Sequence, residues 1–314
     1  MEPLFLKPLF MYRIWGGTAL RDKFNYEIPS ENTGECWAIS SHENGDCIVS
    51  NGIYKGQSLS HLWKEHRNLF GNIPGDKFPL LTKILDANDN LSVQVHPDDH
   101  YAKVNENGEL GKAECWYIID CDNDAEMIFG HNAKSREELK TMIANNEWDN
   151  LLRRVKIKKG DFFYVPSGTI HALCKGTLVL ETQQNSDTTY RVYDYDRVDA
   201  SGNKRELHVN KSIDVTIVPH SQINNDYRVL TSDNFSCTSF ISNEFFSVYK
   251  LDISGECKFH HSTPFSLYSI IEGSGKLIHN NNEYSLNKGD HFILPYNFGD
   301  FKFDGNIEII HSHI

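Results

Sequence analysis

Three side chains of kinds that bind divalent metals stand far apart in this chain, each in a short polar motif. They are His96, Glu114 and His171, and Gln94 adds a neutral amide oxygen two residues before the first histidine. Two imidazoles and one carboxylate can bind a single divalent ion and leave coordination positions open, which is typical of a catalytic rather than a structural zinc site. Iron accepts the same ligands, so the residue types alone do not select the metal.

The stretch around the first histidine alternates in polarity, with Ser92, Gln94 and His96 separated by Val93 and Val95. Because successive side chains of a strand point to opposite faces, the three polar residues would share one face and the two valines the other. We therefore expect a β-strand here whose polar face lines a pocket or meets solvent.

Short strand-like runs separated by Gly, Asn and Asp turns dominate the rest of the chain, most clearly after residue 155. This pattern predicts a mainly β protein of the sandwich or jelly-roll class, with a small helical interruption. The predicted helical segments lie near 58–70 and 135–153. A polar stretch places a domain boundary near 220–235, so we expect domains at 1–230 and 231–314.

A faint internal repeat supports two similar domains. The stretch Lys159–Pro166 recurs as Lys288–Pro295, with the same Lys-Gly-Asp start and the same final proline. The first copy continues to His171, whereas Asp300 stands at the corresponding place after the second. The second domain is therefore expected to lack the metal site, and we interpret His260–His261 as surface or packing residues.

Bulk properties exclude several classes of partner. The formal net charge is −12 over 314 residues, and the isoelectric point is near 5.6, which argues against nucleic acid or an anionic membrane as the general partner. No apolar run approaches the roughly 20 residues of a membrane span, and no signal-peptide core is apparent. Seven cysteines without a Cys-x-x-Cys pair favour reduced thiols. We expect a cytoplasmic protein.

Two lysines and an arginine could supply the local positive charge that an anionic substrate needs. Lys112 precedes Glu114 by two residues, so on a strand both would point to one face. Lys83 is a charged residue among apolar neighbours of a probable strand, where an unpaired buried cation would be costly, which favours a pocket or an exposed face. Arg191 offers a fixed fork of donors that suits an anionic group such as a phosphate.

The segment Gly160–His171 resembles the second cupin motif up to its histidine, although Lys175 stands where that motif often has Asn. Within cupins, four stretches taken together resemble the type I mannose-6-phosphate isomerases in their shorter bacterial form: Gln94–Asp99, Gly111–Glu114, Pro166–His171 and Gln183–Arg191. The resemblance implies a double-stranded β-helix barrel, or jelly roll, present twice. It also implies an enzyme that interconverts mannose 6-phosphate and fructose 6-phosphate through an enediol.

The resemblance further implies a role for each site residue. One Zn2+ per chain would be bound by Gln94, His96, Glu114 and His171, with Lys112 and Arg191 as catalytic residues and Lys83 and Ser92 as substrate-binding residues. The general base stays open among His, Glu and Lys. Two other functions also stay open: a cupin iron oxygenase, and a cupin that binds a sugar phosphate without turning it over. The partner expected is a small sugar phosphate, and the oligomeric state is not predicted.

Overall fold

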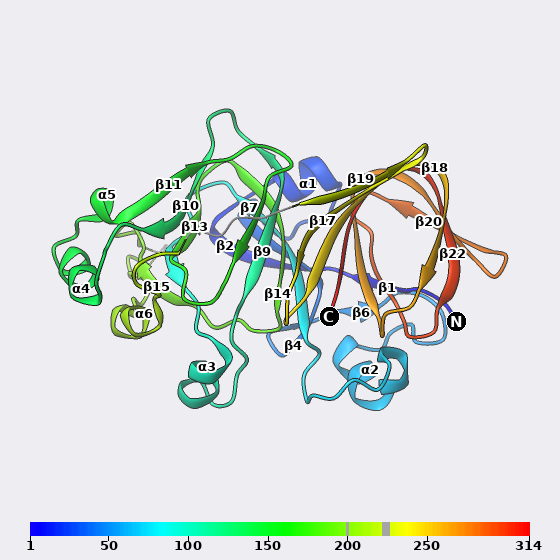
Figure 1. Cartoon of the computed structure of the whole chain (residues 1–314), viewed down its shortest axis with the longest axis horizontal. Coiled ribbons are helices and arrows are strands. Elements are labelled where there is room, and N and C mark those ends of the chain that lie inside the picture. The colour runs from blue at the N-terminus through cyan, green and yellow to red at the C-terminus, as the bar shows by residue number, and fades with distance from the viewer. Residues whose placement is uncertain (199–200, 222–226) are drawn as a thin grey trace.

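Two antiparallel β-barrels lie side by side in the computed structural model, which describes residues 1–198, 201–221 and 227–314 (Figure 1). Two sheets form the first barrel. The six-stranded sheet contains, in spatial order, β12 (Phe162–Val165), β9 (Glu114–Cys121), β14 (Thr177–Gln184), β7 (Leu80–Ala87), β3 (Thr33–Ile39) and β2 (Leu9–Gly17). The five-stranded sheet contains β11 (Leu152–Lys156), β10 (Glu126–His131), β13 (His171–Leu173), β8 (Val93–Val95) and β15 (Tyr190–Tyr193).

The second barrel is one nine-stranded sheet that takes strands from both ends of the chain. Its members are β16 (Arg228–Ser232), β17 (Phe235–Ser242), β18 (Ser247–His261), β22 (Gly299–His313), β19 (Ser266–His279), β21 (His291–Leu294), β1 (Leu4–Lys7) and β6 (Ile48–Val49), with β20 (Asn282–Asn287) paired to β19. The blue N-terminal strand thus lies among the orange and red strands in Figure 1. The division at residue 230 stays a prediction, and this pairing ties the N-terminal segment to the second barrel.

Short helices and one hairpin complete the fold. They are α1 (Ala19–Phe24), α2 (Leu59–Glu65), the 3-10 helix η1 (Arg67–Phe70), α3 (Asp99–Asn105), α4 (Arg136–Ala144), α5 (Trp148–Leu151) and α6 (Val209–Val215), with the hairpin strands β4 (Ser41–His42) and β5 (Gly45–Asp46). The mainly β class and both predicted helical segments are confirmed. Within the described ranges, no helix combines the length and the apolar character needed to cross a bilayer.

Strand alternation separates the cores. On β9, Trp116 and Ile118 join the apolar cluster between the two sheets of the first barrel, whereas Cys115 and Tyr117 join the cluster that packs against the second barrel. The six-stranded sheet is therefore apolar on both faces over most of its length, as expected of a sheet covered on both sides. On the five-stranded sheet, Val93 and Val95 pack outward against α4, α5 and α6, which confirms the alternation expected for this strand.

The Lys-Gly-Asp repeat forms the same turn in both barrels. Gly160 and Gly289 have φ of +90° and +93°, a region that side chains rarely adopt. The carboxylate of Asp161 accepts a hydrogen bond from the Lys158 N–H (2.9 Å), and that of Asp290 accepts one from the Asn287 N–H (2.7 Å). The repeat thus fixes the entry of β12 and β21.

Candidate metal centre and its pocket

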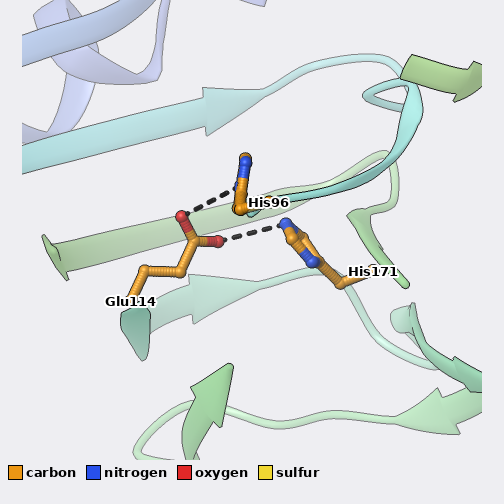
Figure 2. Close-up of side chains that lie close together, drawn as sticks. All are labelled: His96, Glu114 and His171. Atoms are coloured by element: carbon orange, nitrogen blue, oxygen red, sulfur yellow. Dashed lines mark ion pairs between the residues drawn. The ribbon is translucent and has the colours of Figure 1, made fainter. Parts of the chain in front are cut away.

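His96, Glu114 and His171 meet inside the first barrel (Figure 2). His96 directly follows β8, Glu114 opens β9 and His171 opens β13, so the ligands come from both sheets. Nε2 of His96 lies 3.4 Å from Oε2 of Glu114, and Nε2 of His171 lies 3.2 Å from Oε1. All ligand atoms lie within 4.8 Å of one another, and the three side chains are at most 1% exposed.

Backbone carbonyls fix the tautomers of both imidazoles. Nδ1 of His96 donates to the Thr188 carbonyl and Nδ1 of His171 donates to the Thr169 carbonyl, each at 2.8 Å. Since a carbonyl oxygen can only accept, each Nδ1 carries the proton and each Nε2 keeps its lone pair. Metal-binding histidines are oriented in this way.

In the described part of the chain, three of the four candidate ligand atoms make no hydrogen bond, although Lys112 forms an ion pair with one of them. Nε2 of His96 and both carboxylate oxygens of Glu114 are buried without a hydrogen bond among the described residues, and leaving such atoms unpaired costs free energy. Burial lowers the pKa of His96 to about 3, with Lys112 adding to the shift, so this imidazole stays neutral. Burial would raise the pKa of Glu114, but the nearby Lys112 ammonium, the largest opposing cause, holds that pKa well below its usual range. Two imidazoles and one carboxylate therefore fit a divalent cation.

Gln94 lies beside this group. It pairs with His171 across β8 and β13, and its side-chain amide lies 3.3 Å from Nε2 of His171. A half-turn of the amide would present its oxygen there instead of its nitrogen, because the two orientations have the same shape. The fourth predicted ligand is thus within reach of the same ion.

Lys112 contacts the predicted carboxylate ligand directly. It precedes β9, and its Nζ lies 3.1 Å from Oε2 of Glu114 with the side chain only 5% exposed. Burial lowers the pKa of Lys112, but Glu114, Glu181 and Asp187 outweigh burial and raise it above the usual value. The pocket thus holds a buried cation beside the metal ligands.

Lys83 stands on β7, in the same six-stranded sheet as Glu114. Its Nζ lies 3.8 Å from Glu35, 3.9 Å from both Glu181 and Asp187, and 4.7 Å from the centre of the Trp37 ring. None of these contacts is a hydrogen bond, although the side chain is only 4% exposed. The ammonium group therefore keeps donors for a ligand.

Ser92 and Arg191 form a third part of the pocket. Nε of Arg191 donates to Oγ of Ser92 (3.3 Å), and its Nη1 donates to the Glu206 carbonyl (2.7 Å). Arg191 pairs with Gln94 across β15 and β8. The predicted arginine is thus brought next to the predicted ligand strand, while its role stays a prediction.

Two buried carboxylates of this pocket, Glu181 and Glu35, are not among the site residues predicted from the sequence. Glu181 accepts a hydrogen bond from Nε1 of Trp116 (2.8 Å), whose ring lies against His171. The pKa of Glu181 is raised, mainly by burial and next by the nearby negative charge of Glu114. Burial would raise the pKa of Glu35 too, but Lys83 and Arg13 outweigh it and lower that pKa to about 2. The only sequence signal was a lone charge within each apolar strand.

The two acidic residues after His96 cap a helix and hold the loop that follows it. Oδ1 of Asp98 accepts the Tyr101 N–H (2.8 Å) at the start of α3. Oδ1 of Asp99 accepts the Gly111 N–H (2.7 Å). These contacts hold the segment that leads into Lys112.

Known proteins resemble the chain over its full length. Residues 4–120 match the catalytic domain of phosphomannose isomerase type I, and residues 236–314 match the cupin domain of mannose-6-phosphate isomerase. Mannose-6-phosphate isomerase ManA of Bacillus subtilis is 59% identical over 100% of this chain and 99% of its own. Mannose-6-phosphate isomerase of Streptococcus mutans is 54% identical over 99% and 98%.

Solved structures agree. The crystal structure of mannose 6-phosphate isomerase from Bacillus subtilis superposes with a TM-score of 0.99 at 56% identity, covering 100% of both chains. A phosphomannose isomerase variant from Salmonella typhimurium shares the fold, with a TM-score of 0.82 at 15% identity over 100% of this chain and 99% of its own. With its two cupin barrels, its buried His-Glu-His group and relatives this similar from end to end, the chain belongs to the type I phosphomannose isomerase family.

Proposed function

We propose that this protein is a zinc-dependent aldose-ketose isomerase that interconverts mannose 6-phosphate and fructose 6-phosphate through an enediol. The observation that carries the proposal is the buried group of His96, Glu114 and His171, whose ligand atoms all lie within 4.8 Å of one another, in a chain whose full-length relatives bear the isomerase name. Gln94 would supply the fourth protein ligand. Seven free cysteines support a reducing, cytoplasmic location, where thiols persist.

The reaction moves a proton between C2 and C1 while negative charge develops on the sugar oxygens. A bound zinc ion would supply Lewis acidity at the O1 and O2 end of the sugar. The cations of this chain would stabilise the same charge: Lys112 beside Glu114, and Arg191 beside Ser92. Arg191 could also bind the phosphate, and Lys83, whose contacts are all longer than a hydrogen bond, could bind another sugar oxygen.

Glu181 suits the general base better than Lys112 does. The raised pKa of Glu181 makes its carboxylate a stronger proton acceptor, whereas the raised pKa of Lys112 keeps that ammonium protonated. His96 and His171 would be occupied as metal ligands. Glu181 is thus our candidate for proton abstraction, and Lys112 our candidate for charge stabilisation.

Interconversion of the two sugar phosphates by the purified protein tests the proposal. We expect turnover that disappears with a chelator and returns with added zinc. The alternative of an iron oxygenase with the same ligands is tested by supplying iron(II) instead and measuring whether oxygen is consumed. Folded, zinc-loaded protein that fails to interconvert the two sugars would contradict the isomerase and favour a sugar-phosphate-binding cupin.

A further inference from the structure

Another buried histidine lies on the hairpin beside the first barrel and has no place in the proposed mechanism. His42 ends β4, on the hairpin that it forms with β5, and is 6% exposed. Its ring meets the Trp37 ring edge-on, with centroids 5.8 Å apart. Strand β4 and helix α3 lie toward the lower edge of the molecule in Figure 1.

The tautomer of His42 is opposite to that of the two metal-binding candidates. The Asn44 backbone N–H donates to Nδ1 of His42 (3.1 Å). Because a backbone N–H can only donate, Nδ1 carries the lone pair, and Nε2 of the neutral ring carries the proton. This Nε2–H has no hydrogen-bond partner in the part of the chain that the structure describes. The Nε2–H group of His42 is therefore available as a hydrogen-bond donor, and His42 does not fit a metal ligand.

The neighbours of His42 connect it to the pocket wall. The Trp37 ring that it contacts also lies under the Lys83 ammonium, 4.7 Å away. Asp187 joins the same two elements, with Oδ1 3.9 Å from Nζ of Lys83 and Oδ2 accepting from Nδ2 of Asn44 (3.3 Å). The hairpin tip is thus held against the wall that carries Lys83.

Charge around His42 selects the kind of oxygen that it can bind. Burial lowers the pKa of His42, while the nearby carboxylates Asp187 and Glu109 act in the opposite direction. A neutral donor among carboxylates disfavours a phosphate dianion. In contrast, Arg191 has other arginines close to it, Arg197 and Arg205. The phosphate therefore fits the Arg191 side, and a sugar hydroxyl fits the His42 side.

We propose that His42 is a further substrate-contacting residue, whose Nε2–H donates a hydrogen bond to a hydroxyl oxygen of the sugar. The proposal rests on the proposed function, since it needs a sugar phosphate in this pocket. The hairpin at residues 41–46 would then take part in recognising the sugar, a role that the metal-ligand motifs of the sequence do not reveal.

Two amide variants separate this contact from a packing role. In His42→Gln the amide nitrogen can reach the position of Nε2, whereas in His42→Asn it coincides with Nδ1. We expect His42→Asn to raise KM by roughly three- to tenfold, the range for losing one neutral hydrogen bond, and His42→Gln to restore most of it. Metal content and the inhibition constant of inorganic phosphate should not change. The matched control is His61→Asn, at an exposed position on α2.

A wild-type KM for His42→Asn would overturn the proposal, as would equal impairment of both variants. If a variant does not fold, nitrogen NMR of the wild-type histidines replaces it. We expect a protonated Nε2 on His42 that shifts when the equilibrium mixture of the two sugar phosphates is added. A protonated Nδ1, or no shift with saturating sugar, would contradict the proposal. Lack of turnover by the wild type would count against the isomerase and leave this binding test intact.

Discussion

The two barrels share a turn and a fold but differ in what fills them. The first barrel buries a polar pocket that contains Lys83, Lys112, Glu114 and Glu181. The second barrel is filled by an apolar cluster in which aromatic rings are prominent: Tyr268, Phe292, Phe298, Phe301 and Phe303. Barrel architecture therefore does not itself create the site, since function resides in a few side chains placed on a common fold.

Equivalent positions show how few substitutions separate the barrels. Val165 of β12 pairs with Glu114, and Leu294 of β21 pairs with Ser266. Ser266 thus stands where the first barrel has its carboxylate ligand.

The place matching His171 is also changed. Asp300 is 90% exposed there and forms an ion pair with His260 at 2.6 Å, while its neighbour Phe301 fills the core. Because strand side chains alternate, one residue of difference directs this polar pair outward. This agrees with the interpretation of His260 as a surface residue.

Replacing Glu114 and its counterpart Ser266 by alanine should give the largest effect and the greatest difference between the two barrels. Glu114→Ala should release the metal and lower turnover by about a thousandfold, which is roughly 4 kcal/mol at tenfold per 1.36 kcal/mol. Ser266→Ala is the matched control and should keep both metal and turnover. Metal analysis and kinetics of the two purified variants check this, and a metal-loaded, active Glu114→Ala protein would break the comparison.

Truncating a core ring of the second barrel should cost stability rather than chemistry. Phe303 is fully buried, so Phe303→Ala should lower the free energy of unfolding by about 3 to 4 kcal/mol through lost burial and a cavity. Turnover per folded molecule and metal content should stay at the wild-type level. Denaturant titration with parallel kinetics measures both. Loss of metal from the folded variant would show that the second barrel contributes to the site.

Removing the arginine of the pocket should separate catalysis from metal binding. Arg191→Ala should lower turnover by about a hundredfold, or roughly 2.7 kcal/mol, and leave the metal in place. Arg228→Ala, on the exposed strand β16 of the second barrel, is the matched control. Near-wild-type kinetics for Arg191→Ala would remove this residue from the mechanism.

Acid should affect the first barrel through Glu35. Its pKa is lowered to about 2 in the folded chain, against about 4.3 when unfolded. The stabilisation is therefore present above pH 4.3 and is lost as the pH falls toward 2, at a cost of the order of 3 kcal/mol. Unfolding free energies of the wild type and Glu35→Gln, measured from pH 5 downward, should show a smaller acid dependence in the variant. Parallel curves would contradict the assignment.

Much of the fold follows from local pattern. The alternation around Gln94 and His96, the Ser135 cap of α4 and the Lys-Gly-Asp turns are encoded by neighbours in sequence, and all are found in the structure. The pairing of β1 with β21 joins residues almost 290 positions apart, and no local periodicity specifies a contact that depends on tertiary packing.

Prediction of the pocket from the sequence is limited in the same way. The histidines and Glu114 stand in motifs with recognisable spacing, so they could be named from the sequence. Glu181 and His42 gain their character from what surrounds them: burial and Glu114 for the first, and an Asn44 backbone N–H for the second. Neither environment can be derived from residue type.

Anomalous X-ray scattering at the zinc edge, from crystals of the zinc-loaded protein, tests the contrast between the barrels most directly. The account predicts one peak per chain, at about 2.0 to 2.2 Å from Nε2 of His96, Nε2 of His171 and a carboxylate oxygen of Glu114, with none in the second barrel. A peak among other residues, or no peak in protein that binds zinc stoichiometrically, would contradict it.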